Sequence, residues 1–179
     1  MHALKPTQSL PAVAGHAERV VLATSDPVFA GVFKRALEGV RNLRLLVAVT
    51  PSELLEAARQ VAPDLVVLDA DGEDVTALKA LAAKVMLVSD APIVLVSAYL
   101  APGSPGLSAL LQSIAASFVQ KPQGPSSLSL AGEDGPPFVA ALRAAFASQK
   151  DENLSADGLD ADWDIEESGP RRQGGVAHD

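Results

Sequence analysis

The stretch D-L-V-V-L-D at residues 64–69 decides the fold of this chain. Its central residues are apolar on both faces, and an aspartate stands at each end. This pattern is typical of a strand in a parallel sheet, because helices cover both faces of such a sheet. Similar short runs, rich in Val, Leu and Ile, occur at 19–24, 43–48, 92–97 and 115–119. The sequence therefore predicts five buried strands.

Amphipathic helical patterns follow these runs. Asp26-Pro27 supplies an N-cap and a proline at the first helical position, and the apolar stripe after it stops at Gly39. Residues 50–53, Thr-Pro-Ser-Glu, form a capping box before a second helix. Apolar residues at helical spacing predict three more helices, which begin near Val75, Ser104 and Phe138.

This order of elements predicts an α/β fold of the (βα)5 type, a doubly wound parallel sheet of the flavodoxin-like class. Short connections between alternating strands and helices favour right-handed crossovers, which put helices on both faces. The common strand order for five strands is 2-1-3-4-5, and ligands bind beyond the carboxyl ends of the strands.

Four polar residues end or follow the predicted strands at that edge: Asp26, Asp69, Ser97 and Lys121. Two carboxylates, a hydroxyl and an ammonium can together bind a divalent cation and a phosphoryl group. Taken singly, Asp26 also suits a plain N-cap, Ser97 a strand-end hydroxyl and Lys121 a solvated charge. Asp69, with Asp71 two residues on, needs a cation or Lys121 to compensate its repulsion and desolvation.

Composition limits the class of protein. The chain has 179 residues, is 48% hydrophobic and has no cysteine, which predicts one cytoplasmic domain without disulfides. No apolar run is long enough to cross a bilayer, so no membrane role is expected. Residues 1–18 are interrupted by prolines and are predicted to be a disordered leader.

The net charge of −8 lies mostly near the end of the chain. Residues 151–179 hold nine acidic and two basic residues, so 19–149 is predicted as the domain and 150–179 as an acidic disordered tail. Such a tail repels nucleic acid. The tail contains the apolar residues Leu159, Trp163 and Ile165. They are either isolated side chains of a solvating tail or parts of a peptide that folds on a partner protein.

The chain from Arg19 to Phe146 resembles the receiver domain of CheY-like response regulators of two-component systems. The resemblance is carried by V-V-L-A-T-S-D, D-L-V-V-L-D, I-V-L-V-S-A and F-V-Q-K-P, in that order. It implies that Asp69 accepts a phosphoryl group from a sensor histidine kinase. It also implies that Mg²⁺ is held by Asp26, Asp69 and the backbone carbonyl of Asp71.

The remaining family roles fall on three residues. Lys121 would pair with the phosphoryl oxygens, and Ser97 would swing to hydrogen-bond them. Phe118 matches the aromatic switch position, although a core role fits it equally well. The implied protein is a chemotaxis-like phosphorelay component that signals to a downstream protein target. Its only chemistry would be Mg²⁺-dependent self-phosphorylation and dephosphorylation, and its oligomeric state is left open.

Departures from the family pattern support an alternative. Ser25 stands where most receivers have an acid, and Ala77 stands where they have a glycine. The loop after Asp69 also lacks the family's Met-Pro pair. The alternative is a degenerate pseudo-receiver that docks partner proteins without being phosphorylated.

The segment after Lys121-Pro122 is longer than in simple receivers and is similar to the receiver half of CheB-type chemotaxis methylesterases. A methylesterase domain would add a G-x-S-x-G serine turn and a catalytic histidine, and neither is found. The histidines are His2, His16 and His178, all near the ends. The chain is thus a stand-alone receiver or a piece of a longer protein. A nucleotide-binding flavodoxin-like protein is a further alternative, which would need a phosphate-binding loop after the first strand. The sequence T-S-D-P at this place disfavours it, because an acidic residue repels phosphate.

Overall fold

The computed structural model describes residues 17–114, 116–122 and 129–157. Nearly all of the predicted leader lies outside the described residues. The same holds for the part of the predicted tail after Asp157, which contains Leu159, Trp163 and Ile165.

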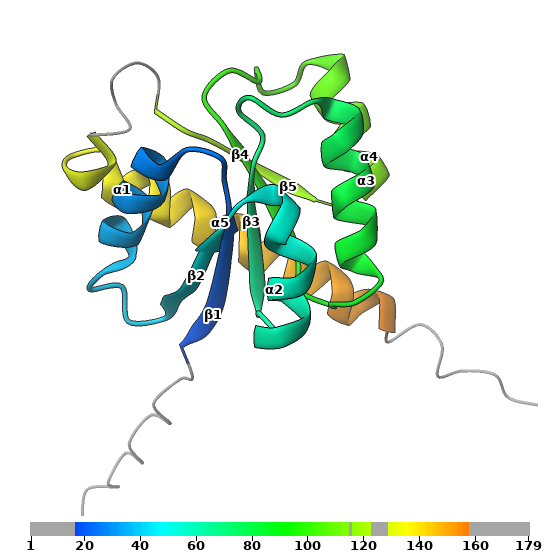
Figure 1. Cartoon of the computed structure of the whole chain (residues 1–179), viewed down its shortest axis with the longest axis horizontal. Coiled ribbons are helices and arrows are strands. Elements are labelled where there is room, and N and C mark those ends of the chain that lie inside the picture. The colour runs from blue at the N-terminus through cyan, green and yellow to red at the C-terminus, as the bar shows by residue number, and fades with distance from the viewer. Residues whose placement is uncertain (1–16, 115, 123–128, 158–179) are drawn as a thin grey trace, which may run out of the picture.

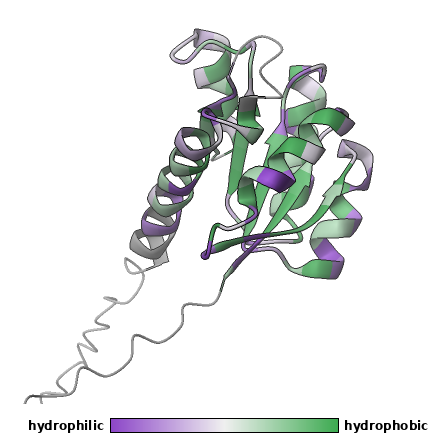
Figure 2. Cartoon of the chain, turned by 90° about the vertical axis from the view of Figure 1, so that its left-hand side faces the viewer, coloured by the Kyte–Doolittle hydropathy of each residue, from purple (hydrophilic) through white to green (hydrophobic). Residues whose placement is uncertain are grey.

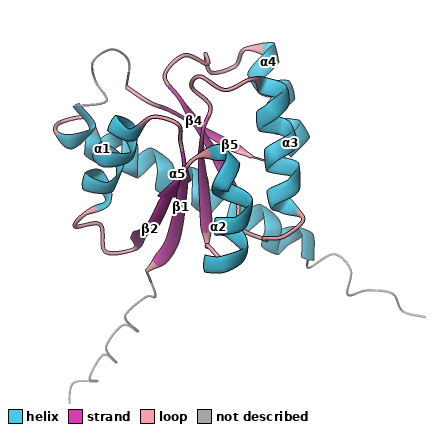
Figure 3. Ribbon diagram, viewed as in Figure 1, coloured by secondary structure: helices cyan, strands magenta, loops and turns pink. Residues whose placement is uncertain are grey.

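A five-stranded parallel sheet forms the centre of the molecule, with the strand order β2-β1-β3-β4-β5 (Figure 3). The predicted fold class and strand order are confirmed. The strands are β1 (Glu18–Ala23), β2 (Leu43–Val49), β3 (Leu65–Asp69), β4 (Ile93–Ser97) and β5 (Ser117–Gln120). Every residue of β3 and β4 is buried, whereas burial alternates along the edge strand β2. Figure 2 shows the central strands mostly in the green of hydrophobic residues.

Helices cover both faces of the sheet (Figure 1). They are α1 (Pro27–Leu37), α2 (Leu54–Val61), α3 (Val75–Met86), α4 (Pro105–Ile114) and α5 (Gly135–Asp157), with short 3₁₀ turns η1 (Pro51–Glu53) and η3 (Ser129–Ala131). Helices α1 and α5 pack with one face of the strands around Leu22, Phe33 and Leu142. Helices α2, α3 and α4 pack with the other face around Leu54, Leu68 and Leu95. No helix in the described ranges is both long and apolar enough to span a membrane.

Local sequence signals set the helix starts. The Val28 N–H donates to Asp26 Oδ1 (2.8 Å), so Asp26 is the predicted N-cap of α1. The predicted capping box is also present, since the Thr50 N–H donates to Glu53 Oε2 (3.0 Å). A third cap, Asp74 at the start of α3, was not predicted.

The last helix differs from its predicted extent. Helix α5 continues to Asp157, so residues 150–157 of the segment predicted as tail are helical. Lys150 anchors this part, because its ammonium lies 3.1 Å from Glu18 Oε1 and 5.6 Å from the centre of the Phe146 ring. The contact with Glu18 joins residues 132 positions apart, which local sequence patterns do not reveal.

Two glycines provide a matched test of packing at the start of α5. A Cβ on Gly135 would lie 2.3 Å from the carbonyl oxygen of Leu130, whereas a Cβ on Gly31 in α1 would meet nothing within 4 Å. We expect Gly135→Ala to lower the free energy of unfolding by roughly 1–3 kcal/mol, because the backbone of η3 must shift. Gly31→Ala should raise it by about 1 kcal/mol through helix propensity. Urea denaturation of both variants measures these changes, and equal effects would contradict this packing.

Candidate functional site

The carboxyl ends of three neighbouring strands bring predicted site residues together. Asp69 is the last residue of β3, Ser97 is the last residue of β4, and Lys121 follows β5 directly. The register aligns the strand ends, since Asp69 pairs with Val96 and Ser97 pairs with Gln120. The Lys121 N–H donates to the Ser97 carbonyl (2.8 Å), which extends the ladder to the site. The predicted meeting of Asp69, Ser97 and Lys121 is therefore found.

The ammonium of Lys121 lies between two carboxylates. Its Nζ is 2.8 Å from Asp69 Oδ1 and 2.6 Å from Asp71 Oδ2. It also lies 4.1 Å from the centre of the Phe29 ring, at cation–π distance. The side chains of Lys121 and Asp69 are only 9% and 2% exposed, so their charges depend on each other for compensation. One cation serves two anions, which leaves the trio with a net negative charge.

The Asp71 carboxylate accepts hydrogen bonds from the end of β4 as well. The hydroxyl of Ser97 donates to its Oδ1, and the Ala98 N–H lies 3.2 Å from Oδ1 and 3.0 Å from Oδ2. The Ser97 oxygen in turn accepts from the N–H groups of Tyr99 and Leu100, both at 3.0 Å. The loop after β4 is thus tied to Asp71 through the Ser97 hydroxyl and the Ala98 N–H.

These contacts determine the charge state of Asp71. Burial raises the pKa of its carboxyl group, but hydrogen bonds from Lys121, Ser97 and Ala98 lower it by more. The net effect places the pKa of Asp71 below its ordinary value, so the group is ionised at neutral pH.

Asp69 is paired at both of its oxygens. Oδ1 accepts from Lys121 and from the Asp71 N–H (3.1 Å), and Oδ2 accepts from the Thr24 hydroxyl (2.7 Å). Thr24 also accepts from the N–H of Asp26 at 3.0 Å. Thr24 is not among the residues that the sequence predicts for this site. The available signal is its position, because it is the first residue after β1 and is 6% exposed.

The three predicted metal-binding residues line one cavity, and each also has partners within the protein. Asp26 lines the same cavity of about 100 Å³ as Asp69 and Asp71, but its carboxylate caps α1. Ser25 Oγ donates to Glu73 Oε1 (2.8 Å). Within the described ranges, no three Asp, Glu, His or Cys side chains lie close enough together to hold a metal ion. The predicted Mg²⁺ set uses two carboxylates and one backbone carbonyl, with water completing the octahedron, and it stays a prediction.

Phe118, the predicted switch residue, lies elsewhere. It is partly buried in β5 and packs against the cluster that includes Leu95 and Leu110. It does not line the cavity around Asp69. This placement is that of a residue at the edge of the core, and its switch role stays a prediction.

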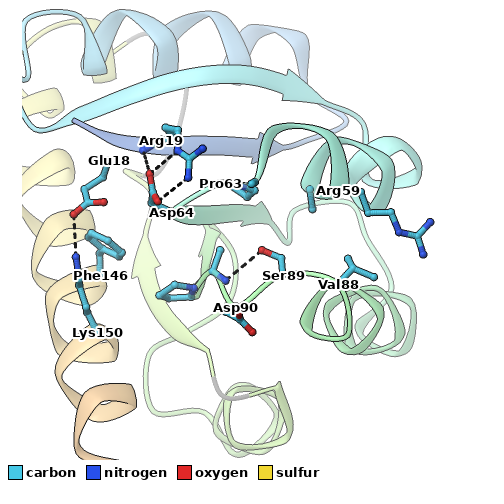
Figure 4. Close-up of a pocket in the computed structure, with 14 residues that line it drawn as sticks. Glu18, Arg19, Arg59, Pro63, Asp64, Val88, Ser89, Asp90, Phe146 and Lys150 are labelled. Atoms are coloured by element: carbon cyan, nitrogen blue, oxygen red, sulfur yellow. Dashed lines mark hydrogen bonds and ion pairs between the residues drawn. The ribbon is translucent and has the colours of Figure 1, made fainter. Parts of the chain in front are cut away.

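A larger pocket, of about 470 Å³, lies at the opposite end of the sheet (Figure 4). Its charged side chains pair largely with one another. Arg19 Nε lies 2.9 Å from Asp64 Oδ2, and Lys150 pairs with Glu18. The hydrogen bond that the Arg19 guanidinium donates to Asp64 raises the pKa of Arg19. These ion pairs connect β1 to the residue before β3 and to α5. The paired charges of this pocket are therefore explained by a structural role.

Comparisons with known proteins agree on the fold. No family model matches the chain, and no curated protein matches it. The chain is similar in structure to the response regulator domain of Thermotoga maritima CheB, with a TM-score of 0.57, 18% identity, and coverage of 74% of this chain and 98% of that one. The receiver domain of a Luxo repressor protein from Vibrio parahaemolyticus gives a TM-score of 0.58, 15% identity, and coverage of 78% and 98%.

A third similar structure is the receiver domain of the response regulator NarL from Mycobacterium tuberculosis. Its TM-score is 0.52 at 23% identity, and the match covers 72% of this chain and 96% of that one. The chain therefore has the fold of CheY-like response regulator receiver domains. The matches include a CheB receiver together with receivers of other proteins, so the fold does not single out the chemotaxis branch.

The buried position of Lys121 predicts a large loss of stability on its removal. Lys121→Met leaves Asp69 and Asp71 buried without a cation, and we expect the free energy of unfolding to fall by about 3–5 kcal/mol. Lys150→Met is the control, since it breaks an ion pair whose lysine is 55% exposed and should cost less than about 1 kcal/mol. Chemical denaturation of both variants tests this, and similar losses would show that Lys121 is not the central charge.

Proposed function

We propose that this chain is a signalling module of the response-regulator type that acts by binding other proteins and does not need phosphoryl transfer to Asp69. The observation that carries this proposal is the neighbour of Asp69 at the end of β1. That neighbour is the hydroxyl of Thr24, and the nearest carboxylate on the same segment, Asp26, is used as a helix cap. The receiver fold supports the signalling role, and the surroundings of Asp69 support the absence of transfer.

Phosphoryl transfer to a carboxylate requires strong neutralisation of charge. The transferred group carries negative charge on three oxygens, and a metal ion with a lysine normally balances it. Here Lys121 is shared between Asp69 and Asp71, and no three Asp, Glu, His or Cys side chains group closely enough among the described residues to hold a metal ion. A third anion at this position would therefore be poorly compensated.

One observation favours a second candidate, in which Asp69 accepts a phosphoryl group from a histidine kinase. Lys121 lies 2.8 Å from Asp69 Oδ1, within reach of oxygens attached to that carboxylate. A cavity of about 100 Å³ also adjoins Asp69. In this candidate the chain would be a phosphorylated component of a cytoplasmic two-component system, with Mg²⁺ bound together with the phosphodonor.

Incubation with Mg²⁺ and acetyl phosphate separates the two candidates. We expect the intact mass of the chain to stay unchanged, because the charge at Asp69 is not balanced. A receiver known to phosphorylate itself from the same donor is the positive control. A gain of one phosphoryl group that requires Mg²⁺ and disappears in Asp69→Asn would contradict the proposal and establish the second candidate.

A second experiment tests docking directly. The proteins cross-linked to the chain in its own cells should be the same for the original chain and for Asp69→Asn, because binding does not depend on phosphorylation. A melting curve first shows that Asp69→Asn is folded, since loss of stability imitates loss of function. A set of partners that is lost on substitution of Asp69 in a folded variant would overturn the proposal.

A further inference from the structure

We propose that the carboxylate of Asp71 is a built-in ligand of an oxyanion-binding site formed by Ser97, Ala98 and Lys121. It lies where the oxygens of a phosphoryl group on Asp69 would otherwise be bound. This inference rests on the proposed function and deepens it, because it names the group that fills the site in the unmodified chain.

The donors of this site converge on one anion from two strand ends. The hydroxyl of Ser97 donates to Asp71 Oδ1, and the Ala98 N–H lies within 3.2 Å of both carboxylate oxygens. Lys121 Nζ, from the end of β5, lies 2.6 Å from Oδ2. A hydroxyl, a backbone N–H and an ammonium are the kinds of donor that bind carboxylate and phosphate oxygens alike. Asp71 itself comes from a third segment, the loop after β3.

Two of these donors are the residues for which the receiver resemblance implies a role toward phosphoryl oxygens, namely Ser97 and Lys121. In this chain both already contact a carboxylate of the protein itself. A phosphoryl group on Asp69 would have to displace Asp71 from these donors or share them with it. Sharing would place two anions side by side in a site where Asp71 is only 15% exposed, which is unfavourable.

Occupation by Asp71 also sets the loop after β4. The Ser97 hydroxyl donates to Asp71 and accepts from the N–H groups of Tyr99 and Leu100, so its orientation is determined by three hydrogen bonds. The side chain of Tyr99 on this loop is 85% exposed. The surface around Tyr99 is therefore held in one arrangement without phosphorylation, as a constitutive docking module requires.

Removal of the Asp71 side chain should turn the site into an anion receptor. In Asp71→Ala the three donors lose their internal ligand, and inorganic phosphate should bind in its place without Mg²⁺. Phosphate at about ten times its dissociation constant shifts the folding equilibrium about elevenfold, which raises the Tm by several degrees. The measurement is the Tm of each protein across a phosphate titration.

Two controls isolate the site. Phosphate stabilises most proteins through exclusion from their surface, so the expected signal is the extra rise of Asp71→Ala over the original chain. Asp74→Asn removes the same charge three residues away and keeps its helix cap, so it should behave like the original chain. Adding Lys121→Met to Asp71→Ala should abolish the extra rise. An equal response of Asp71→Ala and Asp74→Asn, or saturable binding by the original chain, would overturn the inference.

A measurement on the unsubstituted chain does not depend on the folding of a variant. The Ala98 N–H and the Asp71 carboxyl carbon should show a scalar coupling across their hydrogen bond in a long-range NMR experiment. A carboxyl shift of Asp71 equal to that of a solvent-exposed aspartate, without this coupling, would overturn the inference. Neither the phosphate titration nor the NMR measurement uses a phosphodonor. Phosphorylation of Asp69 by acetyl phosphate would therefore contradict the proposed function, whereas the role of Asp71 is tested independently by these two measurements.

Discussion

The buried ammonium of Lys121 is the interaction on which the edge of the sheet depends. Two aspartates from the end of β3 and its following loop would repel each other in a site that excludes water. Lys121 lies within 2.8 Å of both, and the ring of Phe29 from α1 covers its other side. The lysine therefore joins β3, β5 and α1 at one point. Its position requires the parallel sheet, because only aligned carboxyl ends bring these segments together.

The hydrogen bonds around this lysine give each aspartate a different role. Asp69 accepts hydrogen bonds from Thr24, Lys121 and a backbone N–H. Asp71 reaches across to the end of β4 and receives donors from Ser97 and Ala98. Asp26, although it is the first acid after β1, is bound to the first turn of α1. The three aspartates at this edge thus each have partners within the protein, and one lysine is shared between two of them.

The fold was predictable because its signals are local. Short runs that are apolar on both faces, such as D-L-V-V-L-D, are typical of buried parallel strands. The caps at Asp26 and Thr50 mark helix starts within a few residues. The convergence of Asp69, Ser97 and Lys121 followed from the fold, since each ends or follows a parallel strand. The continuation of α5 past residue 149 was not predictable from local patterns, because the partner of Lys150 is Glu18 near the other end of the chain.

The partners of the site side chains could not be deduced in this way. Asp26 attracted the metal-ligand prediction because it is an acid, yet the cap offered by the Val28 N–H is nearer than any partner across the sheet. Thr24 and Asp71 gained their roles from contacts made only after folding, with Asp69 and with Ser97. The sequence by itself determined the strands, the helix starts and the edge where polar residues gather, since these depend on apolar spacing and local hydrogen bonds. The tertiary structure alone decided which donors serve which carboxylate, because that choice depends on distances between segments far apart in the chain.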